Sequence, residues 1–161
     1  MPEIKQDFQN DFNVEAQPEQ LWTFLWDIES MAQCIPGCEE VITHEDKKSY
    51  KARMRRKVGP FVIRIEMDIL IVECEPPKRI VMEVSGKDKR LRSELTQRVT
   101  VSLNVEGDGN CKVVIDTHLQ LSGVLATLGV SLLSGHIEQE INTFVTSLRE
   151  AIEKRKAEGF A

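Results

Sequence analysis

The spacing of hydrophobic residues changes twice along the chain, and each change predicts a different kind of element. Near the N-terminus, Phe12 and Val14 lie between polar neighbours, which predicts a short first strand. Pro18 suits the first turn of a helix because its fixed φ and missing N–H are tolerated there. Apolar residues from Leu21 to Trp26 follow at helical spacing, and Ile35-Pro36-Gly37 ends this helical region.

From Glu40 to Ser122, hydrophobic and polar residues alternate with a period of two. This pattern is typical of antiparallel strands with one buried and one solvated face. Gly59-Pro60 predicts a two-residue turn between two of the strands. Asp108-Gly109-Asn110 predicts a three-residue hairpin, which would place Val105 opposite Val113.

After Ser122 the period becomes 3.6, which predicts a long helix with one apolar stripe: Leu133, Ile137, Ile141, Phe144, Leu148 and Ile152. Gly159 predicts its end. A curved sheet has one large apolar face, and this helix must cover it. We therefore expect one α+β domain over residues 1–161, with a first strand, two short N-terminal helices, about six further antiparallel strands and a cavity where sheet and helix separate.

Composition limits the class of protein without naming its function. The chain has 161 residues, of which 41% are hydrophobic and 29% charged, so it can bury a core without disulfides. The net charge of −5 argues against nucleic-acid binding. No secretory signal and no segment of about 20 apolar residues occurs, so we expect a cytoplasmic protein with reduced cysteines.

Cys34-Ile35-Pro36-Gly37-Cys38 resembles a metal-binding motif only superficially. Zinc needs four ligands, and the three histidines, His44, His118 and His136, do not cluster with this pair in the sequence. A rigid turn with two small buried side chains explains the motif better. The sequence also lacks a glycine-rich phosphate loop, so we expect neither a metal nor a cofactor.

Four cations alternate along one predicted strand, at Lys51, Arg53, Arg55 and Lys57. They suit an anionic partner such as phospholipid headgroups. The alternative is a neutralised outer face, because a two-residue turn at Gly59-Pro60 places Lys51 opposite Asp68 and Arg53 opposite Glu66. The second interpretation accounts for most of these cations.

Polar side chains that point inward carry more information, because burial of a polar group requires a partner or a function. Alternation places Arg56, Ser93, Gln97 and Thr117 on the inner face. Arg56 can reach the rim, pair with a carboxylate or meet the polar head of a ligand.

Acid–base catalysis needs a carboxylate or histidine inside the cavity, and the carboxylates of the strands all alternate outward. His136 is the one titratable candidate near the interior. The sequence therefore favours a binding protein over an enzyme.

The segment from Gly123 to Gly135 is apolar nearly all round and rich in small residues. It suits a tightly packed entry to the last helix, with glycines that allow close approach to the sheet. It also suits a flexible lip over the cavity that touches a membrane or a partner.

Several landmarks together resemble the family of carbon monoxide dehydrogenase G subunits, within the START-like, helix-grip superfamily of polyketide cyclases and lipid-transfer domains. The matching stretches cover nearly the whole chain: Phe12-Asn13-Val14-Glu15-Ala16, Pro18-Glu19, Cys34-Ile35-Pro36-Gly37-Cys38-Glu39, Lys57-Val58-Gly59-Pro60 and Leu121-Ser122-Gly123. The resemblance implies a helix-grip fold, with a seven-stranded antiparallel sheet around the C-terminal helix and an apolar cavity. It also implies an accessory role beside molybdenum hydroxylases, contact with the inner face of the membrane, and a lipid or quinone-like ligand.

These inferences lead to a non-catalytic carrier of a hydrophobic small molecule. The alternatives are a small cyclase or hydrolase of the same superfamily, or a docking factor that binds no ligand. The ligand-binding residues we expect are Trp22, Tyr50, Met54, Arg56, Ile65, Met67, Met82, Leu95, Gln97, Val99, Thr117, Leu119, Leu133, His136 and Ile137. The cavity mouth is expected at Ile35, Pro36, Gly123, Leu125, Gly129 and Leu132.

Overall fold

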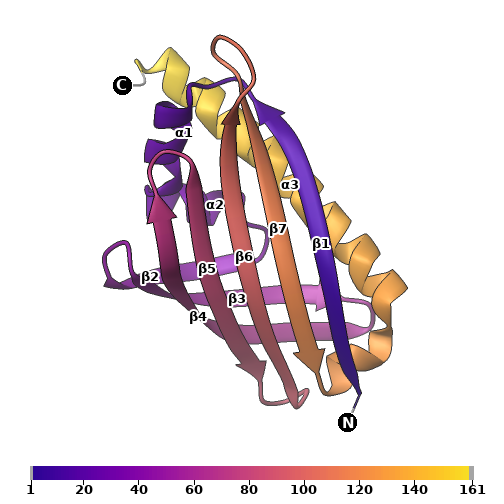
Figure 1. The fold of residues 1–161 in the computed structure, drawn as a ribbon. Helices are drawn as coiled ribbons and strands as arrows, with labels where there is room; N and C mark the ends of the chain where they lie inside the picture. The colour runs from indigo at the N-terminus through magenta and orange to yellow at the C-terminus, as the bar shows by residue number, and fades with distance from the viewer. Residues whose placement is uncertain (1, 160–161) are drawn as a thin grey trace.

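A seven-stranded antiparallel sheet dominates the computed structural model, which describes residues 2–159 (Figure 1). The strands are β1 (Glu3–Val14), β2 (Cys38–Glu45), β3 (Ser49–Val58), β4 (Phe61–Glu75), β5 (Arg79–Asp88), β6 (Ser93–Val105) and β7 (Cys111–Ser122). Their order in the sheet is β1-β7-β6-β5-β4-β3-β2. Consecutive strands from β2 to β7 are neighbours, whereas β1 joins β7 after the chain has passed around the sheet.

The helices lie on the inner side of the sheet. They are α1 (Pro18–Leu25), α2 (Ile28–Cys34), the 3-10 helix η1 (Val124–Leu128) and α3 (Val130–Ala157). Figure 1 shows α3 crossing behind the strands, with α1 and α2 beside its C-terminal half. The predicted architecture, a curved antiparallel sheet around a long C-terminal helix, is confirmed.

The first strand is longer than the sequence indicated. We predicted a short strand around Phe12 and Val14, but β1 has 12 residues and pairs with β7 from Glu3 opposite Ser122 to Val14 opposite Cys111. Polar residues such as Gln6 occupy inward-facing positions of β1, so the first half of the strand lacks the alternation of hydrophobic and polar residues that would have predicted it. The backbone ladder with β7 holds this half of the strand despite its polar side chains.

One predicted hairpin is confirmed and the other is wrong. Gly59 has a φ of +56°, and Val58 pairs with Phe61 across the expected two-residue turn. At the second hairpin, however, Val105 pairs with Cys111, and five residues (106–110) form the loop. The error shifts the register by two residues, which leaves every side chain on the predicted face of the sheet.

Two clusters of buried side chains fill the space between helices and sheet. The first joins α1, α2 and the C-terminal half of α3 to β1, β6 and β7, and includes Phe12, Val14, Leu21, Phe24, Leu148 and Ile152. The second lies at the other end of α3, beside η1, and includes Ile4, Val58, Ile63, Leu121, Leu125 and Leu133.

The segment from Gly123 to Gly135 is largely part of the second cluster. Leu125 and Leu133 are buried, and Gly123 has a φ of +90°. A Cβ on Gly123 would lie 1.9 Å from the carbonyl oxygen of Arg92, so the close approach requires glycine. The packed-entry interpretation describes this segment, whereas Val130 and Leu132 stay exposed.

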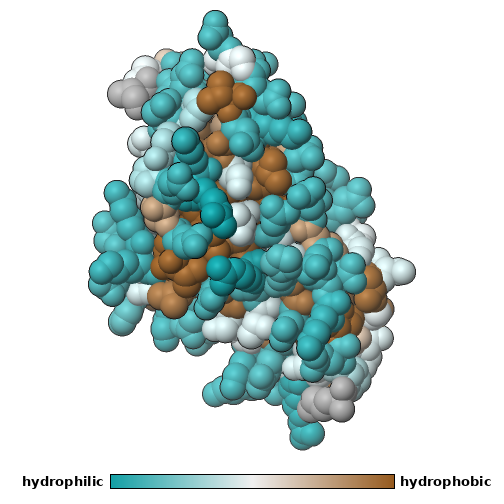
Figure 2. Space-filling model, viewed as in Figure 1, coloured by the Kyte–Doolittle hydropathy of each residue, from teal (hydrophilic) through white to brown (hydrophobic). Residues whose placement is uncertain are grey.

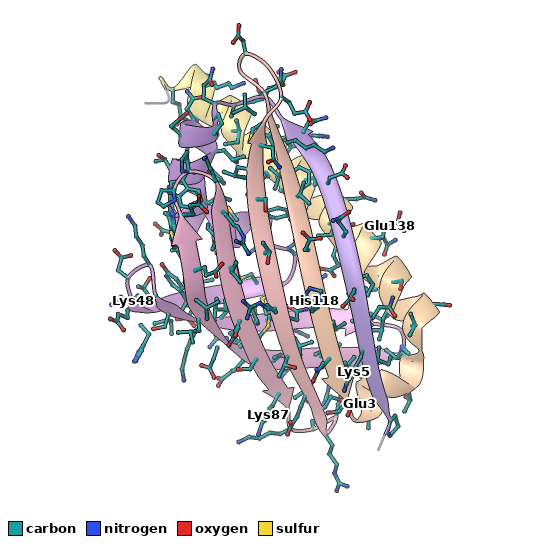
Figure 3. The ribbon with its side chains drawn as sticks, viewed as in Figure 1. Glu3, Lys5, Lys48, Lys87, His118 and Glu138 are labelled. Carbon is teal, nitrogen blue, oxygen red and sulfur yellow. The ribbon has the colours of Figure 1, made fainter. Side chains whose placement is uncertain are left out.

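Charged residues cover the outer face of the sheet. The labelled Lys5, Lys87 and His118 lie on this face in Figure 3, and Figure 2 shows it mostly hydrophilic, with a hydrophobic patch below α1 and α2. Lys51 pairs with Asp68 at 3.7 Å, as expected. Arg53 lies opposite Glu66 in register but forms its ion pair with Glu40 at 3.0 Å, a partner that we did not predict.

No helix within residues 2–159 combines the length and the apolar character needed to cross a membrane.

Candidate functional site

An apolar pocket of about 180 Å³ lies between the sheet, the α1–α2 region and α3. The helical side contributes Leu25, Trp26, Ile28, Met31, Ala32 and Ile35. Inward-facing residues of β2 to β5 contribute Val41, Tyr50, Ile69, Ile71, Ile80 and Met82. Val101 of β6, Val113 and Ile115 of β7 and Phe144 of α3 complete the wall.

Among the described residues of this wall, Tyr50 alone carries a side-chain oxygen. Its hydroxyl accepts a hydrogen bond from the backbone N–H of Lys47 at 2.7 Å, so its oxygen already has a partner at the rim. Burial raises the pKa of Tyr50, which keeps the phenol neutral. The wall therefore carries no charge, and it suits an apolar group.

Helix α2 is fixed over the pocket by contacts at its first turn. Asp27 accepts hydrogen bonds from the backbone N–H of Ser30 at 3.3 Å and from its hydroxyl at 3.0 Å. Arg155, in the last turn of α3, contacts Asp27 and donates to the Ser30 hydroxyl at 2.9 Å. These bonds tie the start of α2 to the end of the long helix.

A second feature is a polar cluster between β3 and α3, formed by Arg56, Glu140 and His136. Glu140 contacts the Arg56 guanidinium and lies 2.8 Å from Nε2 of His136, one helical turn earlier. The three side chains are only 18–23% exposed. Burial, followed by the nearby Arg56 cation, lowers the pKa of His136, so the imidazole is neutral at pH 7 and donates Nε2–H to Glu140.

The loop before β2 connects the cluster with the pocket. Ile35 lies on the pocket wall, and Gly37, two residues later, packs against Arg56. A Cβ on Gly37 would lie 1.9 Å from Cδ of Arg56, so glycine makes room for the arginine stem. On α3, Glu140 lies one helical turn before the pocket residue Phe144.

The predicted binding residues are divided among several places. Tyr50, Met82 and Ile35 lie on the pocket wall, and Arg56 and His136 lie in the polar cluster. Ile65, Leu95, Leu125 and Leu133 belong to the second core cluster. The other inward-facing residues of the set are outside the pocket wall: Met54, Met67, Gln97, Val99, Thr117, Leu119 and Ile137.

Trp22 and most of the predicted cavity mouth do not line the pocket. Trp22 packs against the first core cluster, and its neighbour Trp26 lines the pocket instead. Pro36 also lies outside the wall. Gly123, Leu125, Gly129 and Leu132 belong to the η1 end of the molecule, because the sheet and α3 separate at the α2 end rather than there.

Glu140 is the residue of this site that sequence reasoning missed. It is not one of the apolar stripe residues by which we predicted the last helix. Its spacing of four from His136 was a usable signal, because residues i and i+4 share one helix face. Most of the pocket wall was expected to be buried, but nothing in the pattern separated wall residues from closed core.

The four cysteines are free thiols, and burial raises the pKa of Cys34 and Cys38. These two residues flank the turn between α2 and β2, as expected, but only Cys34 is buried and Cys38 is half-buried. Within residues 2–159, no three His, Cys, Asp or Glu side chains are grouped so as to hold a metal ion.

Solved structures with this fold span nearly the whole chain. A conserved protein from Geobacillus kaustophilus has a TM-score of 0.86 at 18% identity, covering 93% of this chain and 97% of that one. The Zhui aromatase/cyclase from Streptomyces sp. R1128 has a TM-score of 0.75 at 13% identity, covering 98% and 100%. A START superfamily protein from Mycobacterium smegmatis has a TM-score of 0.69 at 11% identity, covering 92% and 97%.

Sequence comparison gives the family. No curated protein matches the chain. The family model for the G subunit of carbon monoxide dehydrogenase (CoxG) matches residues 11–153. This match agrees with the helix-grip fold shown by the solved structures, and the chain belongs to the CoxG family of carbon monoxide dehydrogenase G subunits.

Proposed function

We propose that this protein carries an apolar small molecule, a lipid or a quinone-like compound, without transforming it. The apolar pocket between the α1–α2 region, the sheet and α3 is the observation that carries the proposal. Ligand sites are typically concave and mostly apolar, with few polar groups. A chain that keeps such a space open beside two packed core clusters gives up the dispersion contacts that would fill it.

The pocket volume limits what it can hold. A dry cavity of about 150 Å³ can take up benzene, whereas pockets for drug-sized ligands measure about 300–1,000 Å³. At about 180 Å³, this pocket therefore accepts one ring of a fused system such as naphthalene, or a short branched chain segment. The remainder of a larger ligand would extend along the inner face of the sheet.

Filling the pocket tests this proposal. The probe is 2-ethylnaphthalene, whose binding can be followed by its own fluorescence. We expect Met82→Trp, which puts an indole into the pocket, to weaken binding at least tenfold, because the ring and the probe need the same space. Leu70→Trp, at a site 49% exposed on β4, is the matched control and should leave affinity unchanged. Absence of probe uptake by the wild-type protein would overturn the proposal.

Family membership supports an accessory role beside a molybdenum hydroxylase, where the carrier would meet its partner at the inner face of the membrane. Affinity purification from the native host, followed by native mass spectrometry, tests this role. We expect molybdenum hydroxylase subunits and a bound apolar molecule. A stable partner with a consistently empty pocket would favour a docking factor instead.

One observation favours a second function, that of a small cyclase. His136 is hydrogen-bonded to the inward carboxylate of Glu140 and is neutral at pH 7, as a general base must be. A cyclase of this type would remove a proton from a carbon next to a carbonyl group. The test is exchange of the methyl protons of 2-acetylnaphthalene for deuterium in D₂O. If the wild-type protein accelerates this exchange and His136→Asn does not, the cyclase function is favoured. If the wild-type protein does not accelerate the exchange, the carrier function is favoured.

A further inference from the structure

The cluster of Arg56, Glu140 and His136 has properties that a purely structural ion pair does not need. Arg56 is the one charged side chain among the inward residues of β3, where its neighbours on that face are Met54 and Val58. Moving a charge into such a place costs free energy, and an apolar residue of similar size would often be as stable. A role for Arg56 beyond folding would account for its presence there.

The charges of the cluster sum to zero. Arg56 is cationic and Glu140 is its counterion. His136 adds no charge, because burial and the Arg56 cation lower its pKa. An anionic group brought to this half-buried site would have to displace Glu140 or lie beside it, and like charges at short distance repel strongly at low dielectric. The site therefore favours a neutral polar group over an anion.

The cluster can still bind such a group. A guanidinium carries five N–H donors. In the part of the chain that the structure describes, the ion pair with Glu140 uses the donors on Nη2 of Arg56. When neutral His136 donates Nε2–H to Glu140, its Nδ1 is an acceptor. Spare donors from Arg56 would recognise the oxygen of a carbonyl group.

The cluster lies next to the apolar pocket and to a surface groove. Ile35 of the pocket wall and Gly37 against Arg56 are two residues apart in one turn, so their Cα atoms are at most about 7 Å apart. On the other side, His136 lines a groove with Gly59 and Leu132, between the β3–β4 turn and the first turns of α3. A ligand that extends from the pocket along this turn would therefore reach the cluster.

We propose that Arg56, Glu140 and His136 form a subsite for the uncharged, carbonyl-bearing head of a ligand whose apolar part occupies the pocket. This inference rests on the proposed carrier function and deepens it, because it specifies the chemical class of the ligand. Arg56 donates hydrogen bonds to the carbonyl oxygen, and Glu140 balances its charge. The ligand is thus a neutral amphiphile rather than a fatty acid or other anion.

Three probes with one ring system separate the contributions of pocket and subsite. They are 2-ethylnaphthalene, which is apolar, 2-acetylnaphthalene, which carries a ketone, and 2-naphthoate, which is anionic. We expect the wild-type protein to bind the ketone about tenfold more tightly than the ethyl compound, since a hydrogen bond from a charged donor is worth at least that much. Naphthoate should bind more weakly than the ketone.

The main variant removes both charges together, as Arg56→Met with Glu140→Met, so that neither charge is left buried alone. Its preference for the ketone should disappear, while its affinity for 2-ethylnaphthalene stays within about twofold. The ¹³C resonance of the ketone carbonyl, shifted downfield in the wild-type complex by hydrogen bonding, should lose that shift. A merely structural ion pair would not move this resonance.

Two further variants complete the design. Glu140→Gln leaves the Arg56 cation without its counterion, so naphthoate should gain affinity, by about tenfold. Arg53→Met with Glu40→Met removes an outward ion pair of the same strand and should change none of the three affinities.

The outcomes distinguish this inference from the proposed function. If the wild-type protein binds 2-ethylnaphthalene but the ketone preference survives in the Arg56→Met, Glu140→Met variant, the subsite is refuted and the carrier stands. Tighter binding of naphthoate than of the ketone by the wild-type protein would refute the neutral class of ligand. If the wild-type protein takes up neither apolar probe nor ketone, the proposed function itself fails.

Discussion

At Gly37 the main chain has a φ of +77° and passes against the stem of Arg56. A Cβ there would lie 2.5 Å from the carbonyl oxygen of Arg55 as well as 1.9 Å from Cδ of Arg56. The side chain could move, but the backbone oxygen belongs to β3 and cannot. The glycine of the Cys34–Cys38 motif is thus explained by a close approach and not by metal chemistry.

We predict that Gly37→Ala lowers the free energy of unfolding by about 3 kcal/mol, because steric overlap adds to the strain of a positive φ. Gly107→Ala is the control: its φ is +102°, but no atom lies within 4 Å of the added Cβ, so it should cost only about 1 kcal/mol. Urea unfolding followed by tryptophan fluorescence gives both values. Equal losses would show that the contact with Arg55 is unimportant.

At the scale of elements, α2 is a short part of the pocket wall that packs against α3 and β2. It has seven residues, too few for a helix that is stable alone, and it is held by Asp27 and Arg155. Burial acts to raise the pKa of Asp27, but hydrogen bonds from Ser30 and the Arg155 cation outweigh it, so the pKa is lowered. The folded protein therefore favours the ionised carboxylate.

We predict that Asp27→Ala costs about 1 kcal/mol of stability at pH 7, a typical value for an N-cap, since the side chain is 38% exposed and solvent screens its ion pair. A lowered pKa means that this contribution is full above the unfolded-state value of about 3.9 and is lost as the pH falls through the folded-state value. The two proteins should therefore begin to converge below about pH 4. Glu29→Ala, at an exposed residue of the same turn, should show a smaller loss. A constant difference from pH 7 to pH 3 would contradict the assignment.

The whole molecule has an uneven charge distribution despite its net charge of −5. Arg55 lies opposite Arg64, Lys57 lies opposite Val62, and Arg90 donates to the Val62 carbonyl oxygen. This cationic end also carries the exposed Leu132, close to Gly59. Cations beside an exposed apolar side chain suit an anionic membrane surface, which gives the proposed membrane contact a definite face.

We predict that the protein co-sediments with phosphatidylglycerol vesicles at low salt but not with phosphatidylcholine vesicles. Arg55→Glu with Arg90→Glu should weaken this binding at least tenfold, since each basic residue contributes about 1 kcal/mol near an anionic surface. Lys154→Glu, on the last turn of α3 at the other end, is the matched control. Salt at about 0.5 M should release the wild-type protein. Equal binding of both vesicle types would exclude the electrostatic contact.

Much of the fold could be predicted because hydrophobic period is a local property. A period of two from Glu40 to Ser122 assigns each side chain to a face before the strands pair, and the turn at Gly59-Pro60 fixes one register directly. Lys51 and Asp68 were paired for this reason. The β6–β7 register was not determined in this way, because a shift of two residues leaves the pattern unchanged.

The sequence by itself determined the inner and outer faces, the long C-terminal helix and the inward position of Arg56, since each follows from spacing along one strand or helix. Only the tertiary structure decided that an apolar pocket lies beside α2, that side chains pack into a core cluster beside η1, and that Glu140 contacts Arg56. These outcomes depend on where α3 crosses the curved sheet. That crossing is set by packing between residues far apart in sequence, which no local period encodes.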